Sequence, residues 1–189
     1  MRQNGCDFYA VVLAESPVPT QIQMRPNQLL QAIGAELRMQ IMTYMQTDQR
    51  AAYKAVIDSL APAKRLRPAF ILEKSRAKQA EWLLEQLNTK SNEEVTAQIF
   101  QIWLLKGQPQ MLITFLDAAQ IAHDGKGEVT ELPEVIDDDK AEAAVTALLA
   151  AYPAKQVALY LYMFQQQREG GWISLTKAID ARPELKLEA

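Results

Sequence analysis

Hydrophobic residues recur every three or four positions along most of the chain, which is the spacing of an α-helix with one buried face. The residues that form one such stripe within 26–46 are Leu30, Ile33, Leu37, Ile41 and Tyr44. With Pro at helix starts and Gly or Pro at helix ends, the same spacing predicts helices at residues 26–46, 49–60, 68–88, 91–106, 109–119, 140–152 and 153–168, and a short terminal helix at 172–182.

Residues 157–164 are eight consecutive positions without a charge or an amide. A run of this length is compatible with a buried strand or a buried helix, and periodicity alone does not separate the two. Its flanks favour a helix from about Pro153 to Arg168, because good helix formers continue the run and Gly170 and Gly171 follow it. A helix that is apolar nearly all round has to be covered by other helices.

These elements predict an all-α fold, a compact bundle of about seven helices built from short-linked antiparallel helical hairpins. Residues 25–182 form the expected single domain, with a poorly defined segment at 1–24 and a tail at 183–189. The short connection at Gly107–Pro109 predicts an antiparallel hairpin. Phe70 falls on the inward face of the 68–88 helix.

Local signals predict how two helices begin. Ser91 and Glu94 have the spacing of a capping box, in which each side chain accepts from a free backbone amide at the start of the helix. Asp138 or Asp139 is expected to cap the 140–152 helix. Both predictions rest on residue type and spacing alone.

The composition is that of an ordinary globular protein, with 49% hydrophobic and 23% charged residues. The net charge of −3 gives no overall attraction to nucleic acid or anionic membrane. Cys6 is the single cysteine, so an internal disulfide is impossible and a reducing compartment is expected. The sequence has no recognisable signal peptide or membrane-spanning run. We therefore expect a cytoplasmic protein with no membrane partner.

Positive charge is concentrated in residues 50–78. The basic residues there are Arg50, Lys54, Lys64, Arg65, Arg67, Lys74, Arg76 and Lys78. Only Asp58 and Glu73 oppose them, which leaves a local charge of +6 (eight minus two). Such a segment is able to meet phosphates, but Glu81 and Glu85 continue the face of Lys74 and Lys78, which favours a solvated surface with pairing along the helix.

His123 is the only histidine and lies beside Asp124 in the irregular stretch 123–139. A Ser/His/Asp triad would have to use it, but Cys6 and Ser16 are far away in sequence and no nucleophile elbow is present. A histidine at the end of a helix, interacting with the last carbonyls, is the favoured interpretation. We therefore assign no catalytic residue.

The acidic residues of the same stretch are Asp124, Glu128, Glu131, Glu134, Asp137, Asp138 and Asp139. Oxygen ligands of this kind hold Ca²⁺ or Mg²⁺, but their spacing does not match a calcium loop. The last three acids suit the start of the following helix. We expect no metal and no cofactor, and the acidic stretch has two further interpretations, neutralising the basic segment within the fold or across a dimer.

Four segments together resemble a group of uncharacterised bacterial all-helical proteins, over about residues 65–180. They are Trp103-Leu104-Leu105, the stretch Phe115–Ala119, the stretch Ile121–Val129, and Val157–Tyr162 ahead of Trp172. The resemblance implies a bacterial, cytoplasmic origin. It implies no activity and no site residues.

Taken together, the sequence predicts a non-catalytic protein-interaction or scaffold protein. The expected binding residues are Lys64, Arg65, Arg67, Lys74 and Lys78, together with His123, Asp124 and Glu128 of the loop. The expected partner is another protein, with an acidic surface, or a second copy of the chain. Two alternatives stay open: a nucleic-acid-associated protein that uses residues 50–78, and an enzyme that uses His123.

Overall fold

The computed structural model describes residues 24–188, and these residues form helices and loops without a β-strand. The α-helices are α1 (Pro26–Ala32), α2 (Gly34–Thr47), α3 (Arg50–Leu60), α4 (Pro68–Leu72), α5 (Arg76–Leu87), α6 (Glu93–Ile102), α7 (Pro109–Ala118), α8 (Asp138–Ala151), α9 (Ala154–Gln165) and α10 (Ile173–Asp180). Short 3₁₀ turns lie at Pro62–Lys64, Lys90–Asn92 and Pro183–Leu185, and a π-helix at Trp103–Gly107. The all-α prediction is confirmed.

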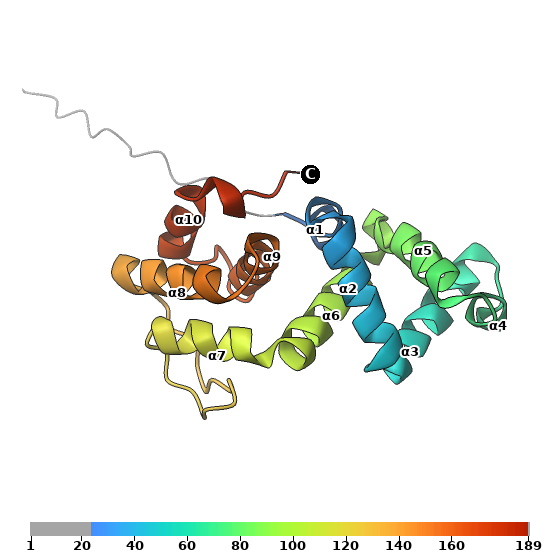
Figure 1. Ribbon diagram of the computed structural model, residues 1–189, viewed down its shortest axis with the longest axis horizontal. Helices are drawn as coiled ribbons and strands as arrows, with labels where there is room; N and C mark the ends of the chain where they lie inside the picture. The colour runs from blue at the N-terminus through green and yellow to red at the C-terminus, as the bar shows by residue number, and fades with distance from the viewer. Residues whose placement is uncertain (1–23, 189) are drawn as a thin grey trace, which may run out of the picture.

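The helices form an elongated molecule (Figure 1). Helices α3, α4 and α5 make up one end, α7 to α10 make up the other, and α1, α2 and α6 lie between them. Helix α1 packs on α6, α2 packs on α3 and α5, and α7 and α10 both pack on α8. One cluster of buried side chains runs through both halves. Within the described residues no helix is long and apolar enough to cross a bilayer.

The uncharged octet forms the middle of helix α9, as predicted. Every residue from Gln156 to Gln165 is buried. Helix α9 contacts α8, α10 and the 3₁₀ turn at Pro183–Leu185, and the ring of Phe115 from α7 lies 4.5 Å from that of Phe164. Helix α9, which is apolar on nearly all sides, is therefore covered by other elements on several sides.

The described chain has ten α-helices, whereas a bundle of about seven was predicted. The eight predicted segments, including the short terminal helix, become ten because two of them are each divided in two. The 26–46 helix breaks at Gly34, whose φ of +84° is accessible to Gly at little cost. The 68–88 helix breaks before Ser75, which has extended backbone and accepts a hydrogen bond from the Lys78 amide at 3.5 Å. A serine that caps a new helix ends the periodic run.

The break at Ser75 also corrects the prediction for Phe70. Because α4 and α5 are separate helices, Phe70 no longer shares a face with the buried residues of α5. Its side chain is 54% exposed, and the Nζ of Lys74 lies 4.3 Å from the centre of its ring. The basic segment therefore carries an exposed aromatic residue that the sequence had placed in the core.

Three further expectations about helix ends and pairing are wrong. The capping box does not form, because α6 has Asn92 as its N-cap and Ser91 lies 3.3 Å from the hydroxyl of Thr89. Helix α8 starts at Asp138 with Asp137 as N-cap, and the side chain of Asp137 makes no capping hydrogen bond. Helices α6 and α7 do not fold back on one another. The π-helix joins them, and α7 packs instead on α8, to which it runs antiparallel (Figure 1).

The structure describes the C-terminal segment of the chain, which was predicted as a tail, but not the N-terminal one. Residues 1–23, with Cys6 and the hydrophobic stretch 8–13, lie outside the described residues. At the other end, the segment predicted as a tail forms the 3₁₀ turn at Pro183–Leu185. Leu185 is fully buried, and this turn packs against α9.

Candidate functional site

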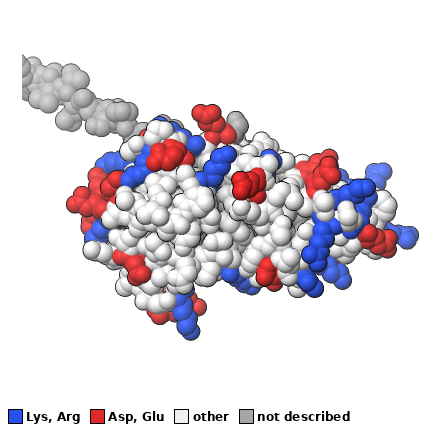
Figure 2. Space-filling view, in the orientation of Figure 1, with Lys and Arg blue, Asp and Glu red and all other residues white. Residues whose placement is uncertain are grey.

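The eight cations of residues 50–78 gather at the end of the molecule formed by α3, α4 and α5 (Figure 2). We call this surface the basic end. All of its Lys and Arg residues are exposed apart from Lys74, which is half-buried. The structure therefore brings together five of the residues predicted to bind, namely Lys64, Arg65, Arg67, Lys74 and Lys78.

A short turn points the central arginines outwards. The turn Pro62–Lys64 ends at Arg65, which has a φ of +57° and donates its amide to the Pro62 carbonyl at 2.8 Å. The Leu66 amide then donates to the Ala61 carbonyl at 3.0 Å, and the Leu66 side chain packs against the core. Anchoring Leu66 leaves Arg65 and Arg67 on the outside.

The cations of the basic end have no carboxylate partner among residues 24–188. The ion pairs within 4.0 Å in that range all involve other residues, such as Arg25 with Glu93 and Lys177 with Asp138. The pairing expected between this surface and Glu81 or Glu85 is therefore not formed as close ion pairs. Asp58, Glu73, Glu81 and Glu85 lie on or next to the same three helices, so residues 50–87 keep a net charge of +4 (eight minus four). This excess gives the basic end a positive potential.

The other three predicted binding residues belong to a compact loop after α7. Nε2 of His123 lies 3.0 Å from Oδ1 of Asp117, and Nδ1 of His123 accepts from the Gly125 amide at 3.1 Å. This arrangement places the ring proton on Nε2, facing Asp117. Both nitrogens are thus occupied by protein groups, and the side chain is only 8% exposed.

Asp124 organises the rest of this loop. Its Oδ1 accepts from the amides of Lys126 at 2.8 Å and Glu128 at 2.9 Å. These two backbone hydrogen bonds hold the pKa of the Asp124 carboxyl below its usual value, since they favour the charged form. Gly125 and Gly127 supply the positive φ values of +81° and +92° that so tight a loop requires. The loop geometry accounts for His123 and Asp124 without a ligand.

The two groups of predicted binding residues do not form one surface. The loop of His123 lies below α7, at the opposite end of the molecule from α4 (Figure 1). The acidic stretch is at the same end as this loop, where Asp137 pairs with Lys140, Asp138 with Lys177, and Glu142 with Arg182. The acidic stretch therefore does not neutralise the basic end within the fold.

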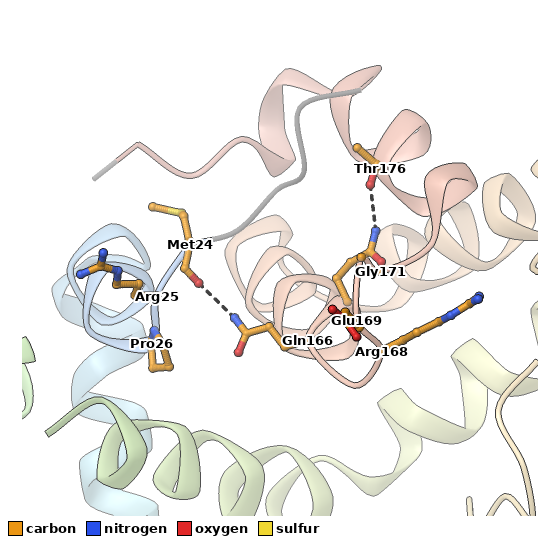
Figure 3. A pocket seen from close by; sticks show the side chains of 10 residues that line it. Met24, Arg25, Pro26, Gln166, Arg168, Glu169, Gly171 and Thr176 are labelled. Carbon is orange, nitrogen blue, oxygen red and sulfur yellow. Dashed lines mark hydrogen bonds between the residues drawn. The ribbon is translucent and has the colours of Figure 1, made fainter. Parts of the chain in front are cut away.

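A polar cleft of about 540 Å³ lies between the start of α1 and the turn that follows α9 (Figure 3). Gln166 reaches across it and donates to the Met24 carbonyl at 3.0 Å, while Arg168 extends away from this contact. Arg25 is 3.8 Å from Glu93. The cleft lies between segments that are far apart in sequence, and no pattern in the sequence predicted it.

A smaller, mostly apolar cavity of about 270 Å³ lies between the π-helix, α7, the loop of Asp124 and α9. Tyr160 is one of its lining residues and is 5% exposed. Its hydroxyl is buried and has no hydrogen-bond partner within the described chain, and burial raises its pKa well above the usual value. Leaving a buried hydroxyl unpaired costs about 1–3 kcal/mol. The sequence showed Tyr160 only as part of the buried octet.

Comparisons with known proteins do not extend this description. No protein-family model, curated protein or solved structure matches the chain. The resemblance to uncharacterised bacterial helical proteins stays a prediction. Among residues 24–188, no group of three or more His, Cys, Asp or Glu side chains is placed to hold a metal ion.

Proposed function

We propose that the protein is a non-catalytic interaction module of the bacterial cytoplasm, whose basic end binds an acidic segment of another protein. The observation that supports this proposal is the gathering of eight Lys and Arg residues on α3 to α5 without a carboxylate partner among residues 24–188. Charge complementarity of this kind steers association and selects the partner.

A protein partner fits the basic end better than a nucleic acid does. Surfaces that bind single strands combine cations with several aromatic side chains on which successive bases stack, and residues 50–78 expose Phe70 alone among large hydrophobic side chains. Neither the polar cleft nor the apolar cavity is lined by a cation of the basic end. Nucleic acid is kept as a second candidate, because Phe70 with Lys74 above it offers one stacking position.

The test compares two labelled probes of equal charge, a twelve-residue Glu/Asp peptide containing one Leu and a single-stranded oligonucleotide. Fluorescence anisotropy is measured at low and at high salt. We expect the peptide to bind at low salt, and binding to weaken as salt screens the charges. The double variant Arg65→Glu, Arg67→Glu is expected to weaken peptide binding about tenfold or more, equivalent to roughly 1.4 kcal/mol.

The control variant Lys106→Glu, Lys186→Glu changes the net charge by the same amount at exposed residues outside the basic end. It is expected to leave peptide affinity within about twofold of the wild type, because long-range charge effects are screened. An equal loss in both variants would show that only net charge matters. Tighter binding of the oligonucleotide than of the peptide would favour the second candidate, and binding of neither probe at low salt would refute both.

A further inference from the structure

A groove of about 440 Å³ lies between the loop that precedes α8, the turn that follows α9 and the start of α10. We call it the α10 groove, and its lining surface is mostly apolar. Val135 and Ile173, the two most exposed large hydrophobic residues of the described chain, both line it and are 74% and 60% exposed. Residues of this type are mostly buried in native proteins, so two of them beside one groove indicate a surface that another apolar segment covers.

The α10 groove adjoins the polar cleft at which the described chain begins. The two share the wall formed by residues 168–171 and Thr176. Met24, the first described residue, lines the cleft, and its carbonyl accepts the hydrogen bond from Gln166 at 3.0 Å (Figure 3). Residues 1–23 therefore join the described part of the molecule beside the wall that the cleft shares with the groove.

The segment 8–13 matches this groove in its chemistry. It reads Phe-Tyr-Ala-Val-Val-Leu, without a charge, and lies between Asp7 and Glu15. Ten residues, 14–23, separate it from Met24. Ten extended residues span up to about 33–36 Å, which is roughly the diameter of a small domain. The connection is therefore long enough for the segment to reach the groove.

A segment of the same chain has an advantage over a partner in solution. A short linker gives a tethered segment an effective concentration of the order of millimolar, so a contact too weak to hold a separate peptide is still made within one chain. We propose that residues 8–13 of the same chain pack in the α10 groove and cover Val135 and Ile173. The α10 groove lies at the opposite end of the molecule from the basic end, on which this inference does not depend (Figure 1).

The experiment uses the full chain, labelled with ¹⁵N and carrying a nitroxide spin label on Cys6. Cys6 is the only cysteine and lies two residues from Phe8, so the label reports where the segment 8–13 lies. Amide signals are compared before and after reduction of the nitroxide with ascorbate. The signals of Val135 and Ile173 are expected to lose most of their intensity while the label is paramagnetic. The signal of Trp82, on α5 at the other end of the molecule, is expected to keep its intensity (Figure 1).

Tethering alone also brings the label near the groove for part of the time, and a double variant separates the two effects. Phe8→Asp, Val12→Asp keeps the label and the length of the connection but places two charges in the segment, and burying a charge without a partner is unfavourable. It is expected to restore most of the intensity of the Val135 and Ile173 signals. Equal broadening in this variant and the wild type would overturn the proposal, and so would a wild type without broadening.

Ile173→Asp tests the groove itself. Ile173 is the first residue of α10, where an acid is compatible with the helix dipole. The matched control is Leu105→Asp, because Leu105 is 58% exposed and does not line the α10 groove. Only Ile173→Asp is expected to restore the Val135 signal, and equal effects of the two variants would contradict docking at this place.

A mixed sample distinguishes the chain's own segment from that of a second copy. Spin-labelled chain without ¹⁵N is mixed with ¹⁵N-labelled Cys6→Ser chain, so that broadening arises only between molecules. The Val135 and Ile173 signals are expected to keep their intensity. Their loss in this mixture would mean that the segment of a second copy occupies the groove, and the proposal would be wrong.

Discussion

The side chain of Gln165 binds both backbone polar groups of Trp172. The Trp172 amide donates to Oε1 of Gln165 at 2.6 Å, and Nε2 of Gln165 donates to the Trp172 carbonyl at 3.0 Å. This pair aligns the indole, which stacks on Phe164 at 4.9 Å and donates its Nε1 hydrogen to the Pro133 carbonyl at 2.9 Å. One amide side chain thus connects α9, α10 and the loop that precedes α8.

Replacing Gln165 by Leu keeps most of the volume but removes three hydrogen bonds, two with Trp172 and one to Oγ1 of Thr176. The Trp172 amide would then be left without this partner in a buried site, whereas the Trp172 carbonyl keeps its hydrogen bond from the Thr176 amide at 3.0 Å. We therefore expect the free energy of unfolding to fall by about 2 kcal/mol. Urea denaturation followed by tryptophan fluorescence measures this loss. Gln166→Leu is the control, because Gln166 is exposed, and its expected loss is below about 1 kcal/mol. Equal losses in the two variants would contradict the role of Gln165.

Gly171→Ala tests the same turn from the backbone side. Gly171 has a φ of +62°, and an added Cβ would lie 2.5 Å from Oε1 of Gln165, which cannot move without losing its bonds to Trp172. Gly125→Ala is the control, because Gly125 has a φ of +81° and nothing lies within 4 Å of an added Cβ. Both variants carry the cost of left-handed backbone, about 1 kcal/mol.

Because of the contact with Gln165, Gly171→Ala is expected to lower the free energy of unfolding by roughly 1–3 kcal/mol more than Gly125→Ala does, as is typical of overpacking. Thermal and urea unfolding of both variants give the difference. In the double variant Gly171→Ala, Gln165→Ala, the two losses are expected to be less than additive, since the obstructing side chain is gone. Full additivity would show that the clash is not the cause.

The loop of Asp124 is expected to open in acid. Its carboxylate has a lowered pKa because it accepts from two amides, so its contribution to stability is present above the unfolded pKa of about 3.9 and is lost as the pH falls through the lower folded value. The amide signals of Lys126 and Glu128 should therefore shift together, with one midpoint below about 3.9. This transition should vanish in Asp124→Asn. A midpoint at or above that value would refute the two hydrogen bonds.

The sequence predicted burial better than it predicted helix boundaries. Leu30, Ile33, Leu37 and Ile41 are all buried as the stripe required, because a bend in a helix does not reverse which face is apolar. Gly34 and Ser75 set the breaks, and both residue types are also tolerated within helices at a modest cost. The breaks at these two residues could therefore not be predicted from the periodic pattern.

The candidate sites were predictable to different degrees. The basic end depends on charges that are close in sequence, so residues 50–78 were found without coordinates. The cavity depends on how α6, α7 and α9 meet, and the buried hydroxyl of Tyr160 on α9 has no partner within the described chain. A tyrosine inside an apolar run gives no sign of whether its hydroxyl has a partner, because that partner comes from elsewhere in the chain.

Phe70 gives the most direct test of the break between α4 and α5. In one continuous helix it would be buried, and Phe70→Ala would cost about 3–5 kcal/mol. In the structure Phe70 is 54% exposed and contacts Lys74, so the expected loss is only about 0.5–1 kcal/mol, the value of an exposed cation–π contact. Phe100→Ala is the comparison, because Phe100 is fully buried on α6, and there we expect the full 3–5 kcal/mol or so. Urea denaturation measures both, and similar large losses in the two variants would mean that residues 68–88 form one helix with Phe70 in the core.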